Sequence, residues 1–403
     1  MVAPPAGRIG RPLRVLHVVV HMTYGGGIER SVLDTFRTFD RGRFSMDVFE
    51  TAPEACNMTD LLGSLGIGRY GYSMRRNYLR LMGRLKGLIR ERRYDVMHAH
   101  LMGFNGAVMR VARACAVPVR VSHYWNTSEN HSNDWKRRLY MAPLRYWDRR
   151  DSTHIVGCSQ AVNETFYPDL AAARHPKLRV CRPGVDMRVF RPHAEKPAIR
   201  RSLGIPEDAV VIGHVGRMVH QKNHAFLIEV AARVMPHVPN ATLLLVGDGV
   251  LRREIEALVA SRGLADRVVF AGVREHVAEV YAAMDVFVLC SHHEGFGIVV
   301  IEAAATGLPL VCVRIPAVTE AVVPCARPYQ FAPGDVVSAT TALLRLTTDR
   351  ALRTALGAEI LREIESFSLG ATTREMELLY EEAFLAAHPT LDGPRIRRPE
   401  QLA

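Results

Sequence analysis

Short runs of Val, Ile and Leu alternate with longer stretches of helical periodicity along the whole chain. In the first half, the apolar runs lie at 14–20, 95–99 and 117–123, with helical stretches at 28–39 and 77–93. In the second half, apolar runs at 210–215, 241–246, 267–271, 286–290 and 310–313 alternate with helical segments at 224–234, 251–261, 277–284 and 298–305. Near-continuous apolar strands separated by helices are typical of parallel sheets that helices cover on both faces. The pattern therefore predicts an α/β protein with two doubly wound parallel sheets.

The two blocks of alternating elements join at residues 182–200, a stretch with three prolines and several charges that predicts a hinge. We expect a first domain over 1–190, a second over 191–370, a helix over 371–388 that returns to the first domain, and a disordered tail over 389–403. Two Rossmann-like domains would then face each other across a cleft. Ligands of such folds bind outside the carboxyl ends of the strands, so the chemistry is expected in loops that follow strands.

Composition narrows the class of protein. The chain of 403 residues is 48% hydrophobic and 23% charged, which is ordinary for globular domains. It has no apolar run as long as a membrane-spanning helix and no recognisable secretory signal, so a cytoplasmic protein is expected. The seven cysteines are widely scattered and form no Cys-x-x-Cys pair, which argues against a disulfide framework or a structural zinc site.

Charge is divided unevenly between the two halves. The net charge of +11 combines +16 over residues 1–200 with −5 over residues 201–403. A strongly basic half indicates an anionic partner: a membrane surface, a phosphorylated substrate or nucleic acid. The segment Arg69–Arg93 holds nine basic residues and one acid. A helix there would place several leucines on one face, which either packs on its own sheet or contacts an anionic membrane.

Three loops after predicted strands carry the candidate chemistry. The first, His21–Arg30, contains three glycines and precedes a helix, so its backbone can approach a ligand and the helix start can bind an anion. Its third fingerprint position is Arg30 rather than glycine, so it does not match a dinucleotide-binding loop. The second loop, 216–223, holds Arg217 and Lys222, which can clamp the two phosphates of a nucleotide diphosphate.

The third loop is the most specific of the three. Glu294 follows the strand at 286–290, Gly-Phe-Gly comes next, and Glu302 falls in the first turns of the following helix. Two carboxylates that face one cleft can accept hydrogen bonds from sugar hydroxyls, and one of them can hold a vicinal diol. The backbone N–H groups of residues 296–298 would face an anion at the helix start.

Together these motifs resemble glycosyltransferase family 4, whose members are retaining enzymes of the GT-B fold. The resemblance covers nearly the whole chain and extends to further motifs in the same order: Asp95-Val-Met-His-Ala-His100, Gly184-Val-Asp186, Leu245-Val-Gly-Asp-Gly249 and Phe270-Ala-Gly-Val273. Two positions depart from the family. Pro183 replaces a common asparagine and should stiffen the hinge, and Glu320 lacks the glycine-rich turn that usually precedes it.

The resemblance implies a role for each matching residue. Glu302 would bind the donor ribose and the Val273 region its base, while Glu294 would face the donor sugar and phosphates. His123 matches the family's active-site histidine near the transferred sugar, and His98 and His100 are interpreted as mostly structural. The donor diphosphate would contact, or be given room by, the following residues: Gly26, Gly27, Arg217, Lys222, Phe296, Gly297 and Ile298.

The implied activity is transfer of a hexosyl or N-acetylhexosaminyl group from a nucleotide diphosphate sugar, UDP-linked by preference, to a hydroxyl acceptor with retention. The acceptor would be a lipid-linked sugar or a small molecule, in polysaccharide, glycolipid or natural-product biosynthesis. No two aspartates lie two positions apart, so the metal-binding Asp-x-Asp motif is absent and no metal or cofactor is expected. A nucleotide-sugar-binding module, an epimerase of the same fold and a nucleic-acid-binding protein remain as alternatives.

Overall fold

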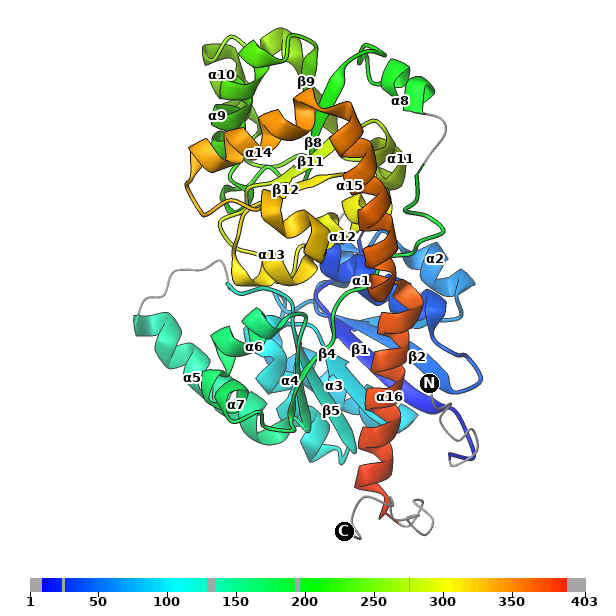
Figure 1. Ribbon diagram of the computed structural model, residues 1–403. Helices are drawn as coiled ribbons and strands as arrows, with labels where there is room; N and C mark the ends of the chain where they lie inside the picture. The colour runs from blue at the N-terminus through cyan, green and yellow to red at the C-terminus, as the bar shows by residue number, and fades with distance from the viewer. Residues whose placement is uncertain (1–8, 24–25, 129–134, 193–195, 275, 390–403) are drawn as a thin grey trace.

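The computed structural model describes residues 9–23, 26–128, 135–192, 196–274 and 276–389, which form two α/β domains stacked end to end (Figure 1). The first domain contains a seven-stranded parallel sheet in the order β3-β2-β1-β4-β5-β6-β7. Its strands are β1 (Leu13–Val19), β2 (Phe44–Glu50), β3 (Gly68–Gly71), β4 (Val96–Ala99), β5 (Val119–Tyr124), β6 (His154–Gly157) and β7 (Leu178–Val180).

The second domain contains a five-stranded parallel sheet in the order β10-β9-β8-β11-β12. Its strands are β8 (Val210–Val215), β9 (Ala241–Val246), β10 (Val268–Gly272), β11 (Val286–Leu289) and β12 (Leu310–Cys312). Every residue of β9 and β11 is buried, because helices cover both faces of the sheet. The two doubly wound parallel sheets that the apolar runs predict are therefore confirmed.

Helices connect successive strands in both domains. The first domain has α1 (Gly27–Thr38), α2 (Thr59–Ser64), α3 (Tyr78–Arg92), α4 (Asn105–Ala114), α5 (Trp135–Asp151), α6 (Gln160–Phe166) and α7 (Pro168–Ala172). The second has α8 (Lys196–Ser202), α9 (His224–Val234), α10 (Arg252–Ser261), α11 (Val277–Ala282), α12 (Ile298–Ala305), α13 (Pro316–Ala321), α14 (Val336–Thr348) and α15 (Arg350–Glu363). No helix among the described residues is both long enough and apolar enough to cross a membrane.

The last helix, α16 (Leu369–Ala387), runs along the first domain although the chain reaches it from the second (Figure 1). Glu377 accepts a hydrogen bond from the backbone N–H of Asp40 at 2.9 Å and pairs with Arg43 at 3.0 Å. Tyr380 is fully buried in the first domain beside Phe44. Residues 390–403, where a disordered tail is expected, lie outside the described residues.

The chain crosses between the domains twice, and the two crossing segments run side by side. The backbone N–H of Val185 donates to Phe367, and that of Leu369 donates to Val185, both at 2.9 Å. Gly184 is required here, since a Cβ at this position would lie 2.7 Å from Cα of Leu369. Pro183 precedes it within the expected hinge.

Four strands of the first sheet were not predicted from the apolar runs: β2, β3, β6 and β7. Strands β6 and β7 have four and three residues, too few to show a period. Strand β2 ends at Glu50, whose carboxylate is buried, pairs with Arg69 and accepts the N–H of Met22 at 2.8 Å. Its charge is neutralised within the fold, so a strand that looks polar lies inside the sheet.

The basic helix α3 packs on its own sheet. Its apolar face, formed by Leu81, Leu85, Leu88 and Ile89, is buried in the core of the first domain. Its arginines at positions 80, 84 and 90 are exposed. The leucines that suggested a contact with lipid therefore stabilise the fold instead, although the first turn of the helix is different, as described below.

Candidate active site

Two loops of the second domain, 216–223 after β8 and 291–297 after β11, are fastened to one another. The backbone N–H of His292 donates to the carbonyl of Gln221 at 2.8 Å, and the Gln221 amide donates to the carbonyl of His293 at 2.9 Å. The rings of His220 and His292 stack with centroids 4.8 Å apart. His292 and His293, for which the sequence suggests no role, thus hold the two loops in register.

This register brings Lys222 and Glu294 together. Nζ of Lys222 lies 2.6 Å from Oε1 of Glu294, and both side chains are largely buried. The hydroxyl of Ser291 donates to the same carboxylate oxygen at 2.7 Å. Charge-assisted hydrogen bonds of this kind are short and strong, and they fix a mobile ammonium at one place. The lysine therefore has a defined position beside the third loop.

Two helix N-termini, one from each domain, meet next to this pair. Helix α1 begins at Gly27 and α12 at Ile298, and a Cβ on Gly27 would lie 3.5 Å from Cδ1 of Ile298. Neither helix has a side-chain capping bond. Gly297 has φ of +100°, a conformation that lets the chain turn directly into α12. Uncapped N–H groups and the positive ends of two dipoles make this a place for an anion.

The neighbouring positions are filled in different ways. Phe296 is buried and lies 5.8 Å from the ring of Phe367. At Gly26, a Cβ would lie 1.8 Å from Oε2 of Glu29, so the missing side chain leaves space for that carboxylate. Gly26 therefore accommodates an acidic group in the first turn of α1.

Glu302 lies deeper in α12 and is almost fully buried. Its Oε2 accepts a hydrogen bond from the hydroxyl of Tyr281 at 2.8 Å. Burial raises the pKa of Glu302, while the Tyr281 hydrogen bond and the charge of Arg30 oppose that rise. Arg30 comes from α1 in the first domain and lies over the ring of Phe190 at 5.7 Å. The carboxylate is thus held in one orientation and influenced by both domains.

The side chains of Arg217 and Val273, two predicted site residues, are open to solvent. The Arg217 side chain is exposed and has no hydrogen-bond or ion-pair partner among the described residues. Val273 is 69% exposed at the end of β10. Gly247 links the loops that carry these two residues. Its backbone N–H donates to the carbonyl of Gly272, next to Val273, and a Cβ on Gly247 would collide with the carbonyl oxygen of Gly216, next to Arg217. The contacts described do not bring either side chain against Glu294 or Glu302.

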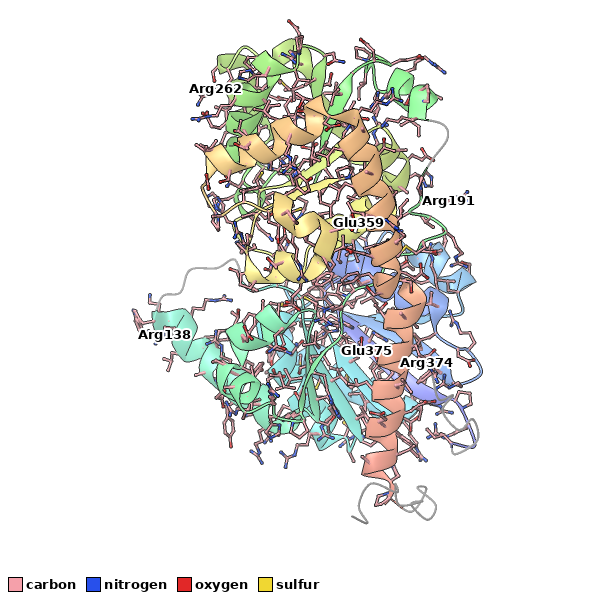
Figure 2. The ribbon with its side chains drawn as sticks, viewed as in Figure 1. Arg138, Arg191, Arg262, Glu359, Arg374 and Glu375 are labelled. Atoms are coloured by element: carbon pink, nitrogen blue, oxygen red, sulfur yellow. The ribbon has the colours of Figure 1, made fainter. Side chains whose placement is uncertain are left out.

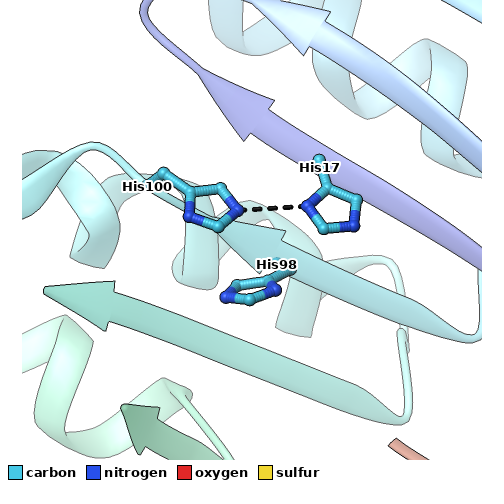
Figure 3. A group of neighbouring side chains, drawn as sticks. All are labelled: His17, His98 and His100. Carbon is cyan, nitrogen blue, oxygen red and sulfur yellow. Dashed lines mark hydrogen bonds between the residues drawn. The ribbon is translucent and has the colours of Figure 1, made fainter. Parts of the chain in front are cut away.

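In the first domain, His123 belongs to a group of four buried histidines, His17, His98, His100 and His123, which we call the histidine cluster. Figure 3 shows three of its members: His17 lies on β1, His98 on β4 and His100 just past the end of β4. Burial lowers the pKa of His17 and of His123 to about 3, and those of His98 and His100 well below their usual range. All four rings are therefore neutral at physiological pH.

One hydrogen-bond chain in the cluster has a fixed direction. The indole Nε1–H of Trp125 donates to Nδ1 of His100 at 3.0 Å. Because indole can only donate, Nδ1 of His100 is the acceptor and its Nε2 carries the proton. That Nε2 lies 3.1 Å from Nδ1 of His17, so it donates there (Figure 3). Nε2 of His17 then carries a proton and has no partner among the described residues.

A second chain leads to His123. The hydroxyl of Tyr380 in α16 contacts Nδ1 of His98, and Nε2 of His98 lies 3.1 Å from Nδ1 of His123. The ring of His123 also stacks on Trp125 with centroids 4.0 Å apart. Nε2 of His123 is buried without a partner among the described residues. His17 and His123 both line a small cavity of about 50 Å³ under the crossing segments.

The loop after β5 connects the histidine cluster to the second domain. A Cβ on Gly295 would lie 1.9 Å from the carbonyl oxygen of Trp125, so this backbone contact requires glycine. The hydroxyl of Thr127 donates to the carbonyl of Glu294 at 2.9 Å, and that of Ser159 to the carbonyl of Gly295 at 2.6 Å. The segment that follows His123 in sequence therefore contacts the Glu294 loop directly.

Comparison with known proteins agrees with this arrangement. Residues 25–189 match the model for "Glycosyltransferase Family 4" and residues 195–361 that for "Glycosyl transferases group 1". EpsF of Bacillus subtilis, named as a glycosyltransferase, is 32% identical over 314 residues, covering 77% of this chain and 80% of that one. The chain belongs to glycosyltransferase family 4.

Another relative and a solved structure show how far the likeness extends. The UDP-Gal:alpha-D-GlcNAc-diphosphoundecaprenol alpha-1,3-galactosyltransferase of Escherichia coli is 25% identical over 351 residues, covering 84% of this chain and 89% of that one. HepE of Anabaena, solved in complex with UDP, superposes with a TM-score of 0.78 at 20% identity, covering 92% of this chain and all of that one. The fold of this glycosyltransferase is therefore GT-B.

Several residues of the glycosyltransferase site were missed from the sequence. Ser291 lies three positions before Glu294, and that spacing beside a loop carboxylate is the signal that could have found it. Tyr281 and Tyr380 lie far along the chain from the groups they contact, and no local pattern marks them. Glu320, judged a weak family match, accepts the backbone N–H groups of Gln160 and Ala161 at 3.0 Å and so joins the two domains.

Two groups of side chains in the described residues bring possible metal-ligating atoms within 4.8 Å of one another. One is His17, His98 and His100, where the fixed hydrogen bonds described above already account for the His17–His100 contact. The other, Cys325, Glu359 and Glu363, lies away from the site loops and partly open to solvent. The Glu363 carboxylate there accepts the backbone N–H of Cys325 at 3.0 Å.

Proposed function

We propose that this glycosyltransferase moves a hexosyl or N-acetylhexosaminyl group from a UDP-linked sugar to a hydroxyl acceptor bound by the first domain. The observation that carries the proposal is the meeting of two uncapped helix N-termini, at Gly27 and Ile298, beside the fixed ammonium of Lys222. Such a place suits a diphosphate. UDP as the donor nucleotide is supported by HepE, which was solved with UDP, and by the relative named for UDP-Gal.

The remaining donor contacts follow from the same geometry. Glu302, fixed by Tyr281, would accept the ribose hydroxyls, and Arg217 is free to move onto the phosphates. The exposed Val273 would cover the base. Glu294, held by Lys222 and Ser291, and His123, held through Nδ1, would face the transferred sugar. In this proposal Nε2 of His123 contacts a sugar hydroxyl when the donor is bound.

Departure of the diphosphate leaves negative charge that must be stabilised in the transition state. Lys222, Arg217 and the N-terminus of α12 can supply that stabilisation with fixed dipoles and cations, so we propose a reaction that needs no metal ion. We also propose retention through attack on the same face from which UDP leaves. No carboxylate is assigned as a nucleophile: Glu294 is paired with Lys222, and Glu302 is bonded to Tyr281.

The proposal is tested by the shift that nucleotides cause in the unfolding temperature. UDP, GDP and ADP are each added at the same concentration, about 100 times the dissociation constant of UDP, where UDP binding stabilises the fold by about 2.7 kcal/mol. We expect UDP alone to raise the midpoint by several degrees, with or without EDTA. Glu302→Gln should lose most of that shift, whereas Glu254→Gln, an exposed glutamate on α10, should keep it.

Other outcomes have distinct meanings. A shift by GDP or ADP rather than UDP would replace the proposed donor, and a shift abolished by EDTA would overturn the metal-free clamp. UDP-glucose converted to another UDP-sugar without an acceptor would indicate an epimerase. Retention is checked on isolated product, where the anomeric proton coupling measured by NMR must match that of the donor sugar.

A further inference from the structure

Exposed aromatic side chains are concentrated in one region of the first domain. In the described part of the chain, the exposed aromatic residues are Tyr78, Trp135, Tyr140 and Tyr146. All of them lie on α5 or in the first turn of α3, together with the exposed Leu79 and Leu139. Contiguous apolar surface of this kind on a folded protein marks a place of interaction.

Helix α5 buries only a narrow stripe of its surface. Met141, Leu144, Asp148 and Asp151 face inward and pack on α4. The two helices approach so closely at Gly106 that a Cβ there would lie 1.8 Å from the carbonyl of Leu144. No element among the described residues covers the opposite face, and Trp135 and Leu139 are each 69% exposed. Figure 1 shows α5 at the outer edge of the domain.

The charges of α5 are segregated in the same way. Its two acids are buried and satisfied: Asp148 accepts from Tyr124 at 2.7 Å, and Asp151 pairs with Arg113 at 2.6 Å. Lys136, Arg138 and Arg145 lie on the exposed side. Figure 2 shows Arg138 at the periphery of the molecule, pointing away from the sheet. The outward face therefore combines large apolar side chains with positive charge.

The first turn of α3 extends this face. Tyr78 and Leu79 are exposed, and Leu79 is 79% open to solvent. The ring of Tyr140 on α5 lies 6.0 Å from that of Phe104, and Phe104 packs against the core cluster that contains Leu81 of α3, so the two helices adjoin. Arg75, Arg76 and Arg80 are exposed and lie within three positions of Tyr78 in sequence. The two helices thus form one surface, which we call the α5 face: residues 75–80 and the outward side of 135–146.

We propose that the α5 face docks the enzyme on an anionic lipid bilayer. Trp and Tyr have an apolar body and a polar edge that suit the headgroup region, and leucines enter the acyl boundary beneath it. Lysine and arginine beside them are attracted to anionic headgroups. A second copy of the chain would bring equal positive charge against this face, which makes it a poorer occupant.

Docking there has a consequence for the proposed function. Helix α5 begins ten positions after Trp125, the residue that stacks on His123 and meets Gly295. A membrane against α5 would hold the acceptor-binding domain at the lipid surface. Lipid-linked acceptors could then reach the site from the bilayer, whereas the donor arrives from solution. Lipid binding itself does not depend on the proposed function and can be measured without any substrate.

The test uses the full chain and flotation with vesicles of phosphatidylcholine alone or with phosphatidylglycerol added. We expect binding to the anionic vesicles that salt weakens and little binding to the neutral ones. The double variant Lys136→Gln with Arg138→Gln should lower the partition coefficient between anionic vesicles and water about 25-fold, because each positive charge that is lost weakens binding about fivefold. Trp135→Ser with Leu139→Ser should lower it about tenfold. In the wild type, Trp emission should shift to the blue on binding.

Matched controls lie on the second domain. Arg253→Gln with Arg350→Gln removes two exposed arginines, and Val250→Ser with Val337→Ser removes two exposed apolar side chains; neither pair should change lipid binding. Equal binding to neutral and anionic vesicles, or full binding by the α5 variants, would overturn the proposal. So would a concentration-dependent dimer, seen by ultracentrifugation without lipid, that Trp135→Ser with Leu139→Ser dissociates.

Discussion

The hydroxyl of Tyr380 contacts Nδ1 of His98 across 282 positions of sequence. Through the other ring nitrogen of His98, this contact reaches Nδ1 of His123. The side chain that fixes the histidine of the site thus comes from α16, a helix that the chain enters only after completing the second domain. The return of α16 to the first domain therefore has a chemical consequence as well as a structural one.

We predict that Tyr380→Phe slows the reaction without weakening donor binding. The variant keeps the buried ring and removes the hydroxyl that orders the protons along His98 and His123. We expect kcat to fall about tenfold, the effect of losing one hydrogen bond of about 1.4 kcal/mol in the transition state. KM for the donor should stay within about twofold, because Glu302 and Lys222 are untouched.

Tyr167→Phe is the matched control for that experiment. Its hydroxyl is also buried and bonded, in this case to Asp148, but it lies outside the two chains of the histidine cluster. It should lower the unfolding temperature and leave kcat unchanged. Equal losses of kcat in both variants would show that Tyr380 only supports the fold.

Much of the fold follows from patterns that are local in sequence. The apolar runs at 210–215 and 241–246 are β8 and β9 without any shift, and the segments 224–234 and 298–305 are helices α9 and α12 as expected. Both strands are largely buried, and each helix buries an apolar face, so their hydrophobic patterns show directly in the sequence. Glu294 and Glu302 were found because the turn between them must contain glycine.

The rest depends on contacts between distant segments. The buried carboxylate of Glu50 hides β2 from a hydrophobic pattern, because the cation that neutralises it, Arg69, lies on another strand. The outward face of α5 escaped notice for the opposite reason. The sequence does not show which side of Trp135–Asp151 packs on α4, and only that packing leaves Trp135 and Leu139 uncovered.

Gly295→Ala should disrupt the contact between the domains at Gly295 and Trp125. The added Cβ would lie 1.9 Å from the carbonyl oxygen of Trp125, and the backbone must move apart to admit it. We expect kcat to fall by at least about tenfold, since displacement of a reacting group by about 1 Å can cost about 100-fold. UDP binding should weaken less than kcat falls, because Lys222, Arg217 and Glu302 all lie in the second domain, and calorimetry measures it.

Gly83→Ala is the control for this substitution. Gly83 is an exposed residue of α3, and a Cβ there meets nothing within 4 Å. Alanine should stabilise the helix by up to about 1 kcal/mol and leave kcat unchanged. Full activity in Gly295→Ala would mean that the approach of Trp125 is not needed for catalysis.

A double-mutant cycle should show that Lys222 and Glu294 act as one unit. Each single variant, Lys222→Met or Glu294→Gln, leaves a largely buried polar partner without its counterpart. We expect the losses of UDP binding and of unfolding stability in the two single variants to add up to more than the loss in the double variant. The difference, which is the coupling free energy between the two side chains, should be about 0.5–3 kcal/mol. Arg233→Met with Glu229→Gln, an exposed pair on α9, should show additivity.

Acid should unfold the protein because several histidines are buried as neutral rings. The pKa values of His17, His123 and His224 are lowered by burial to about 3, and that of His214 to about 4. In the unfolded chain these groups titrate near pH 6.5. Below that pH the unfolded state takes up protons that the native state does not. The stabilising contribution of these histidines to the free energy of unfolding is therefore complete above about pH 6.5. It is lost as the pH falls toward 4, by about 1.4 kcal/mol per pH unit for each histidine.

His224→Phe isolates one of these contributions. Both ring nitrogens of His224 are buried without a hydrogen-bond partner among the described residues, and its ring packs edge-on against His214 at 4.8 Å. Phenylalanine keeps the ring and removes the two unsatisfied nitrogens, so we expect a gain of about 1 kcal/mol at pH 7. At pH 5 the gain should grow by about 2 kcal/mol, because the variant no longer takes up a proton on unfolding. Denaturant titrations at both pH values measure the difference, and a gain that does not change with pH would show that His224 is protonated in the native state.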